Sequence, residues 1–420
     1  MTKLRERSYN GEYFDAETIL TWPLEGLTIV EVSAFIAGPY AGLNLAQMGA
    51  EVIRIDPIGG GLDYKRWPVT EGGNSLYWNG LNKGKKSVTL NVRDPRGREI
   101  AHALMTEPGA TSGIVVTNLP ATGWLDYELL KSKRDNLIMV NIVGQRDGSI
   151  ALDYTVNARA GFPLITGPVG LGKPVNQVVP VWDVLTGMSA ANAVLIAEQH
   201  RQITGEGQYV RIALADTAFS VLSHLGYVAE AQINKVDRSA EGNHVFGTFG
   251  CDFETFDSGR VMITAFTRRH WQALLEATNL SSRFEKIAND AKVDLQKEDE
   301  RYRMRHIIEA ELKPWFKERT LNEIRTVLDE KRVCWAPYQS VRECIENDPD
   351  MSVANPMFQE IYQPGVGTHL AAGLSAEFGA LNRRDVVPAP LLGQDTQKVI
   401  SNKLGFSVKE IEELQENGII

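Results

Sequence analysis

The chain has 420 residues, of which 43% are hydrophobic and 23% charged, and its formal net charge is −9. This length suits two domains or one large domain with an insertion, and the composition is that of an ordinary globular protein. The acidic balance argues against a nucleic-acid binder, and no run approaches the ~18 consecutive apolar residues that a membrane span needs.

The N-terminal residues Met1–Asn10 are polar and charged and lack the apolar centre of a signal peptide. The three cysteines, Cys251, Cys334 and Cys344, have no CxxC spacing, so we expect neither disulfides nor a cysteine zinc site. The seven histidines are scattered without an HxxxH or HExxH pair, and we expect no metal centre. These features together predict a cytoplasmic protein.

The first third of the chain alternates between short apolar, β-branched stretches and helical patterns. We predict strands at residues 27–33, 51–56, 87–92, 113–119 and 136–144, and helices at 40–48, 95–106 and 124–134. Such alternation is typical of a parallel α/β sheet. The first strand–loop–helix unit resembles the start of a Rossmann fold, but the GxGxxG spacing is absent, so we infer neither NAD nor FAD.

The middle of the chain begins with a Gly- and Pro-rich span, residues 145–177, which we predict to form loops over the sheet edge. An apolar helix then runs from Val184 to about Gln202, and we expect its spaced apolar residues to lie in the core. That face consists of Leu185, Met188, Ala191 and Leu195. A strand at 209–214 and a helix at about 215–233 follow.

The βαβ rhythm is lost after residue 240. Short β segments at 243–266 precede helices near 270, at 302–316 and at 321–331. The C-terminal part contains a short strand at 333–335, a helix at 341–347, further β segments up to 380 and a helix at 408–417. We therefore predict a large α/β domain from residues 1–230 and 335–420, and a small α+β domain from residues 240–334.

One carboxylate stands between an apolar run and the predicted middle helix, in the stretch Pro180–Met188. Asp183 is a natural helix N-cap, because its carboxylate can accept a hydrogen bond from a free N–H in the first turn. A second interpretation is an ionised carboxylate at a helix N-terminus, beside apolar residues such as Trp182, that acts as a nucleophile. Both interpretations are compatible, since a cap carboxylate has a second oxygen.

A basic turn, Asn82–Ser87, offers side-chain donors at every position except Gly84. Lysine side chains bind phosphates as point charges, and a glycine lets the backbone approach them. The same cluster also fits an ordinary solvated turn. The residues alone leave both interpretations open.

Several stretches in the same order resemble the family III CoA-transferases. They are Ala37–Pro39, Leu45–Asp56, Asn82–Val88, Arg201–Leu214, Pro390–Thr396 and Leu404–Ile420. In that family an Asp before a helix, followed four residues later by Gly, carries the acyl and CoA groups, and Asp183 with Gly187 matches this pattern. The resemblance implies that Asp183 is catalytic, that the substrate is the acyl-CoA thioester of a dicarboxylic acid, and that no cofactor is needed. It also implies a Rossmann-like large domain built from both chain ends and an interlocked homodimer.

Positions that line CoA in relatives can be carried over to this chain. They are Phe35, Lys83, Lys85, Lys86, Leu90, Arg93, Asn118 and Leu119. Leu90 also fits a strand residue of the core. Pro57 and Trp124 stand where relatives carry arginines, so the resemblance implies an adenine site that is built differently here.

Three stretches carry a narrower resemblance, to members of the family that move CoA between the two carboxyls of one C5 dicarboxylate. They are Asp56–Val69, Val181–Gly187 and Asp252–Phe256. The implied reaction is intramolecular CoA transfer between C1 and C4 of an unsaturated dicarboxylate through an aspartyl-CoA thioester. Arginines are the usual carboxylate ligands, and Arg66, Arg146 and Arg211 are all candidates for the distal carboxylate.

Three alternatives remain. The first is intermolecular transfer between a dicarboxylyl-CoA donor and a free acid, and the second is a non-catalytic carrier of CoA esters. The third is a racemase, but racemases of the family pair the Asp with a His about 30 residues upstream, where we place Leu152, which cannot transfer a proton. For the tetrahedral oxyanions of acyl transfer, the start of the middle helix and the turn at Ala37–Gly38 are the predicted N–H donors.

Overall fold

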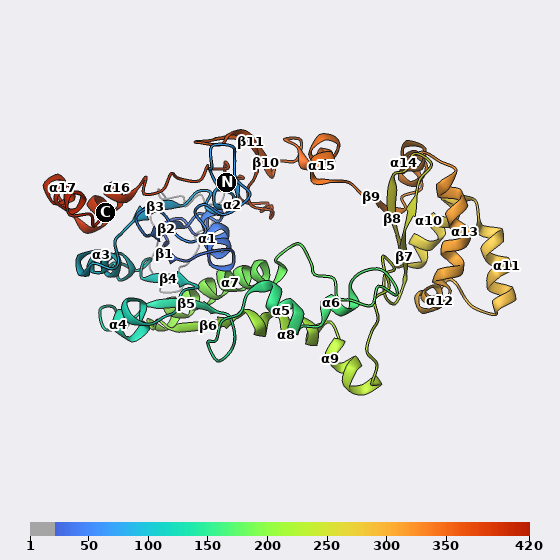
Figure 1. Cartoon of the computed structure of the whole chain (residues 1–420), viewed down its shortest axis with the longest axis horizontal. Helices are drawn as coiled ribbons and strands as arrows, with labels where there is room; N and C mark the ends of the chain where they lie inside the picture. The colour runs from blue at the N-terminus through green and yellow to red at the C-terminus, as the bar shows by residue number, and fades with distance from the viewer. Residues whose placement is uncertain (1–21) are drawn as a thin grey trace, which may run out of the picture. The chain divides into compact units, whose positions relative to one another are not determined.

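Figure 1 shows the structure, a computed structural model that describes residues 22–420. The described chain divides into two compact units. Unit 1 contains residues 22–156, 179–225 and 349–420, and unit 2 contains residues 157–178 and 226–348. The predicted large domain starts outside the described residues. Residues 157–178, 226–230 and 335–348, predicted in the large domain, belong to unit 2. Strand β9 (Cys334–Pro337) pairs with a strand of that unit.

Unit 1 is built on a six-stranded parallel sheet with the order β3-β2-β1-β4-β5-β6. The strands are β1 (Thr28–Val32), β2 (Glu51–Asp56), β3 (Lys86–Thr89), β4 (Ile114–Thr117), β5 (Ile138–Val143) and β6 (Tyr209–Ala213). This is the strand order of a doubly wound Rossmann-type sheet, which confirms the predicted parallel α/β fold. Neighbouring strand residues such as Ile29 and Val30 belong to different core clusters, because successive side chains point to opposite faces.

Helices cover both faces of the sheet (Figure 1). On one face lie α1 (Ala37–Gln47) and α7 (Val181–Thr204), and on the other lie α3 (Pro95–Met105), α16 (Thr396–Leu404) and α17 (Val408–Glu416). The C-terminal helices thus share a core cluster with the N-terminal strands. Other elements of unit 1 are α2 (Leu76–Leu81), η1 (Gly123–Leu125), α4 (Tyr127–Lys131), α8 (Leu214–His224), η3 (Pro349–Met351) and the hairpin of β10 (Phe358–Gln363) with β11 (Gly367–Ala372).

Several predicted elements differ from the structure. The span 145–177, predicted as loops, contains α5 (Asp153–Arg159) and α6 (Phe162–Ile165). The predicted helix at 215–233 is interrupted at Gly226, whose φ of 84° is a left-handed conformation that ends α8. It continues as α9 (Tyr227–Ala229) and a π-helical turn, Glu230–Asn234. On α7 the predicted core face is only partly right, because Met188 is 47% exposed.

Unit 2 is an α+β unit around an antiparallel sheet of β7 (Phe249–Glu254), β8 (Arg260–Ala265) and β9. Besides α6 and α9, its helices are α10 (Arg268–Thr278), α11 (Ser281–Ala291), α12 (Glu298–Arg303), α13 (Arg305–Lys317), α14 (Leu321–Glu330) and α15 (Val341–Asn347). The core is mainly aliphatic and contains several buried aromatic residues, and the rings of Phe253 and Phe316 are stacked 4.3 Å apart. Across residues 22–420, none of the helices combines the length and apolar character that crossing a bilayer requires.

Candidate active site

Asp183 lies within the first turn of α7, because the helix begins at Val181 and not at Val184 as predicted. The N-cap position is occupied by Pro180, which has no side-chain acceptor. Asp153 supplies the cap instead: its Oδ2 accepts hydrogen bonds from the backbone N–H groups of Trp182 (2.7 Å) and Asp183 (3.0 Å). The N-cap interpretation of Asp183 is therefore wrong, and its own carboxylate is not the group that caps α7.

The Asp153 contact also changes the predicted source of oxyanion donors. The N–H groups of residues 182 and 183 already have a carboxylate acceptor, so the start of α7 offers the reaction fewer donors than expected. In contrast, α1 begins at Ala37 after Ile36, whose apolar side chain cannot accept a hydrogen bond. Because the first N–H groups of a helix have no partner within the helix, the start of α1 stays the predicted donor site.

Burial and a neighbouring charge alter the acidity of Asp183. Its side chain is largely shielded from solvent, and burial, followed by the charge of Asp153, raises its pKa to about 7, with Arg66 acting in the opposite direction. Asp153 is itself 2% exposed. A negative charge beside a poorly solvated carboxyl group disfavours ionisation of that group. A carboxylate with a pKa near neutrality is a stronger base than an ordinary aspartate, while a substantial fraction stays ionised at pH 7.

Gly187, one turn after Asp183, has a packing reason to be glycine. A Cβ atom there would stand 2.7 Å from the carbonyl oxygen of Ala37 and 3.1 Å from the Cβ of Tyr40. Any larger residue would separate α7 from α1. The glycine of the motif therefore lets the start of α1, with its uncapped N–H groups, approach the first turns of α7 that carry Asp183.

The loop after β1 is held in a strained conformation. Phe35 has a φ of 64°, in the left-handed region that non-glycine residues rarely adopt. Its N–H donates to Oδ2 of Asp63 at 3.1 Å, and the side-chain amide of Asn118 bonds both the N–H (2.9 Å) and the carbonyl (2.6 Å) of Ala34. Backbone strain of this kind persists where the surroundings fix it, often at functional sites.

A network of buried charged side chains is connected to the loop after β1. The Arg54 guanidinium bonds Glu31 (3.2 Å), Asp56 (2.8 Å) and Asp63 (3.1 Å), and all four side chains are nearly inaccessible to solvent. Lys85 joins the network with its Nζ 2.8 Å from Glu31. Burial lowers the pKa of Lys85 to about 8 although Glu31 opposes the shift. Asp63 therefore connects the network to the backbone of Phe35.

The structure separates the predicted CoA-binding residues into two groups. Phe35 follows β1, Leu90 and Arg93 follow β3, and Asn118 and Leu119 follow β4, so all five lie at the carboxyl edge of the parallel sheet. Ligands of doubly wound sheets bind at this edge. The Leu90 side chain is fully buried in the core, and its backbone N–H donates to the carbonyl of Asp56 at 3.0 Å. Arg93 is exposed.

The three lysines lie elsewhere. Lys83 and Lys86 stand before or at the start of β3, at the amino edge of the sheet. Nζ of Lys83 donates to the carbonyl of Ala372 at 2.6 Å, and Lys86 forms an ion pair with Glu51. Lys85 is fixed between Glu31, Asn82 and the carbonyl of Pro39. The structure thus gives each lysine an internal partner and does not gather the three around one phosphate.

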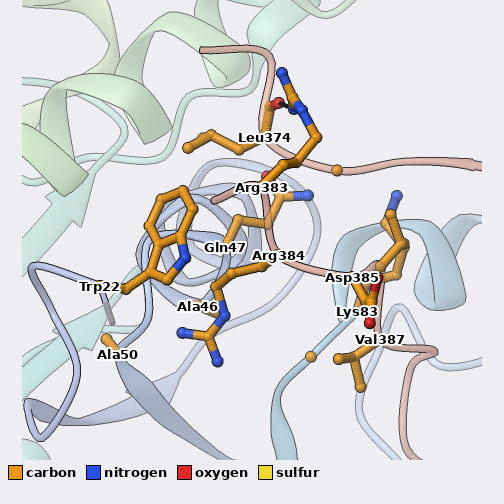
Figure 2. A pocket seen from close by; sticks show the side chains of 13 residues that line it. Trp22, Ala46, Gln47, Ala50, Lys83, Leu374, Arg383, Arg384, Asp385 and Val387 are labelled. Carbon is orange, nitrogen blue, oxygen red and sulfur yellow. Dashed lines mark hydrogen bonds between the residues drawn. The ribbon is translucent and has the colours of Figure 1, made fainter. Parts of the chain in front are cut away.

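A pocket at the amino edge contains one of these lysines (Figure 2). It is lined by Trp22, by Lys83, by the end of α1 and by the segment 373–387, from which Arg383 and Arg384 come. The Trp22 Nε1 donates to the carbonyl of Asn382 at 3.1 Å. Because it lies at the edge opposite the strand ends near Asp183, this pocket is not part of the Asp183 site.

A group of side chains with metal-binding donors occurs in unit 2. In the described part of the chain, His244, His306 and Glu309 bring their donor atoms within 4.8 Å of one another. Nε2 of His244 is 3.1 Å from the Glu309 carboxylate, and the two imidazole rings are 4.9 Å apart between centroids. The two histidines and Glu309 therefore contact one another. The sequence did not predict this cluster because His244 and His306 are far apart along the chain.

Comparison with known proteins identifies the family. The family model for CoA-transferase family III matches residues 24–396. The chain belongs to CoA-transferase family III. This family III CoA-transferase is 50% identical over 398 residues to 2-methylfumaryl-CoA isomerase of Chloroflexus aurantiacus. The alignment covers 94% of this chain and 97% of that protein. The family and enzyme class expected from the sequence are thereby confirmed.

Two more distant comparisons agree. Succinyl-CoA:mesaconate CoA-transferase of Haloarcula marismortui is 29% identical over 388 residues, covering 87% of this chain and 91% of its own. The crystal structure of a CAIB/BAIF family protein from Brucella suis superposes with a TM-score of 0.75 at 23% identity, covering 91% of this chain and 99% of that one. The latter supports the fold. The interlocked dimer and the compartment stay predictions.

Proposed function

We propose that this family III CoA-transferase moves CoA between the C1 and C4 carboxyls of one C5 unsaturated dicarboxylate, converting 2-methylfumaryl-CoA into 3-methylfumaryl-CoA. The 50% identity to 2-methylfumaryl-CoA isomerase supports the choice of substrate. The observation that carries the proposal is the Asp183 carboxylate, which occupies the family's Asp-x-x-x-Gly pattern in the first turn of α7, where Gly187 packs against the start of α1.

In the first half of the proposed reaction, an Asp183 oxygen attacks the C1 thioester carbon, the carbon–sulfur bond breaks, and CoA leaves as the thiolate. The product is a mixed anhydride between the acid and Asp183. The thiolate then attacks the aspartyl carbonyl of the anhydride and releases the dicarboxylate. This leaves an aspartyl-CoA thioester, and no proton needs to be transferred.

The second half reverses these steps at the other end of the acid. The C4 carboxylate attacks the aspartyl-CoA thioester and expels the thiolate, and the thiolate attacks the C4 carbonyl of the new anhydride. Asp183 is regenerated as a carboxylate. A carboxylate nucleophile suits this exchange because carboxylates replace each other in an anhydride at nearly equal free energy, whereas a serine ester would not exchange in this way.

An intermolecular transfer is the second candidate, because the 29% identical relative is a succinyl-CoA:mesaconate CoA-transferase. The two functions share the aspartyl intermediates and differ in where the accepting acid comes from. Purified enzyme with 2-methylfumaryl-CoA and no added acid should give 3-methylfumaryl-CoA. If product forms only after a free acid is added, the intermolecular function replaces the one proposed.

The role of Asp183 is tested by Asp183→Ala. We expect at least a ~10³-fold loss of kcat with retained binding of the CoA ester, because the variant lacks the nucleophile. Hydroxylamine added during turnover should convert Asp183 of the wild type into a hydroxamate detectable by mass spectrometry. Asp216→Asn is a matched control, since Asp216 is a solvent-accessible carboxylate paired with Arg146. Unchanged activity in Asp183→Ala contradicts the proposal.

A further inference from the structure

A substrate with two carboxyl groups needs a cation for whichever carboxylate is not bound to CoA. Of the three arginines considered for this role, Arg66 is the one whose charge acts on Asp183. It lies between β2 and α2, and its guanidinium stands 5.6 Å from the ring of Phe35 and 5.2 Å from the ring of Tyr77. Aromatic faces orient a guanidinium while leaving its N–H groups free for bidentate bonds to a carboxylate.

The Arg66 guanidinium has no anionic partner among the residues that the structure describes. Within residues 22–420 it forms no salt bridge with a carboxylate. This distinguishes it from Arg54, which is buried among three carboxylates at the same edge of the sheet. A cation of this kind beside a half-buried nucleophile is available for an anionic substrate group.

Tyr77, the other group of this site, provides a second and independent observation. In the described structure its hydroxyl is buried and makes no well-formed hydrogen bond. Burial, together with the negative charge of Asp183, raises the pKa of Tyr77 to about 12, although Arg66 opposes the shift. The hydroxyl therefore stays protonated and can donate. A buried donor without an acceptor is unfavourable unless a ligand or water satisfies it.

The other two arginines have different surroundings. Arg146 forms a salt bridge with Asp216 at 3.1 Å, and its side chain is 86% exposed. Arg211 lies on β6, where it acts on the charges of Asp147 and Tyr209. Asp183 is not among the groups that either of them influences. The structure thus separates three arginines that the sequence left equivalent.

We propose that Arg66 and the Tyr77 hydroxyl bind the free carboxylate of the dicarboxylyl-CoA substrate and so determine that this enzyme acts on dicarboxylic acids. The inference rests on the proposed function, because it presupposes that Asp183 is the acyl carrier. The two carboxylates of the acid are chemically alike, so the same pair of groups can hold either end. Arg66 and Tyr77 also retain the free dicarboxylate while CoA is bound to Asp183. Because this acid does not leave the site, the CoA returns to the same molecule and the transfer stays intramolecular.

The test compares two thioesters that differ only in the second carboxylate: 2-methylfumaryl-CoA and a 2-methylbut-2-enoyl-CoA, in which a methyl group replaces it. The rate of covalent adduct formation at Asp183 is measured with each by quenched-flow mass spectrometry. In Arg66→Gln we expect the rate with the dicarboxylyl thioester to fall about 100-fold, through loss of a charge-assisted bidentate contact, and the rate with the monocarboxylyl thioester to change less than about threefold. Tyr77→Phe should show the same pattern at about tenfold.

Arg146→Gln is the matched control and should leave both rates unchanged. If Arg66→Gln lowers both rates equally, or lowers neither, Arg66 does not bind the second carboxylate and the inference is overturned. Absence of any Asp183 adduct in the wild type would instead overturn the proposed function.

A second measurement adds ¹³C-labelled free dicarboxylate during turnover. Wild-type product should stay unlabelled, whereas product of Arg66→Lys, which has a single point charge, should incorporate label. Unlabelled product from both would contradict the retention of the acid.

Discussion

Arg54 in unit 1 and Arg301 in unit 2 are both fully buried, but they bond different kinds of partner. In unit 1, Arg54 is 1% exposed and neutralises Glu31, Asp56 and Asp63. In unit 2, Arg301 is 0% exposed and donates to the backbone carbonyls of Leu295 (3.0 Å), Ala265 (3.2 Å) and Phe266 (2.7 Å). Arg54 thus neutralises buried carboxylates, whereas Arg301 connects backbone segments through hydrogen bonds to their carbonyl groups.

The acidity of the two guanidinium groups reflects this difference. Burial lowers the pKa of Arg301, whereas for Arg54 the opposing effect of Asp56, Glu31 and Asp63 exceeds that of burial and the pKa is raised. Through Asp63 the Arg54 network reaches the strained backbone of Phe35 at the candidate active site. Unit 1 therefore buries paired charges where the site is positioned, whereas the buried arginine of unit 2 bonds neutral carbonyl groups beside an apolar core.

The comparison predicts its largest effect for Arg54→Met. Three buried carboxylates would lose their main cation, and breaking a buried ion pair typically costs about 3–5 kcal/mol. We expect the free energy of unfolding, measured in urea at pH 8, to fall by about this amount and activity to be lost. Unpaired buried carboxylates have a raised pKa in the folded state, so the folded form binds more protons and the deficit should shrink as the pH falls toward 5. A deficit that is equal at both pH values would show that charge is not its cause.

The matched change in unit 2, Arg301→Met, sharpens the contrast. It leaves neutral carbonyl groups without a donor, and an unsatisfied buried acceptor costs about 1–3 kcal/mol. The loss of unfolding free energy should be the same at pH 8 and pH 5, because the orphaned groups do not titrate in that range. A strong pH dependence in this variant would remove the distinction between the two arginines.

The parallel sheet could be predicted because its signals are local. Strand β2 occupies the predicted residues 51–56, and the apolar β-branched stretches around it became the remaining strands. The span 145–177 was mispredicted as loops because its glycines and prolines obscure two short helices, α5 and α6. Asp153, at the start of α5, was therefore missed, although it contacts the helix that carries Asp183.

The lysines of the Asn82–Ser87 turn show that residues adjacent in sequence can have different surroundings. In extended backbone, successive side chains point in opposite directions. Lys85 therefore enters the buried network, while Lys86 pairs with Glu51. Conversely, Arg66, Tyr77 and Asp183 come together only through the fold. The Asp-x-x-x-Gly motif predicted the nucleophile from the sequence, but only the tertiary structure indicates which side chains lie near it.

Asp183→Asn should stabilise the protein while it inactivates it. The folded-state pKa of about 7 lies above the ordinary value of 3.8, so the folded state binds more protons between these pH values and ionised Asp183 destabilises the fold as pH rises. The neutral amide avoids this cost. We expect the variant to gain about 1–2 kcal/mol at pH 8, after allowance for partial exposure, and almost nothing at pH 4. A variant less stable than wild type at pH 8 would show that burial of the ionised Asp183 carboxylate does not destabilise the fold.

The smallest expected effect is the most specific. Asp153→Asn keeps an oxygen that can accept from the N–H groups of Trp182 and Asp183, but it removes the charge that helps raise the pKa of Asp183. The acid limb of the kcat/KM profile, which reports ionisation of the free nucleophile, should therefore move to lower pH by about one unit or less. Asp153→Ala would remove the cap as well, at a cost of about 1 kcal/mol in stability. If the acid limb moves equally in both variants and only Asp153→Ala is destabilised, Asp153 acts on Asp183 through its charge and on α7 through its hydrogen bonds. An acid limb that stays in place in both would mean that burial alone sets the acidity of the nucleophile.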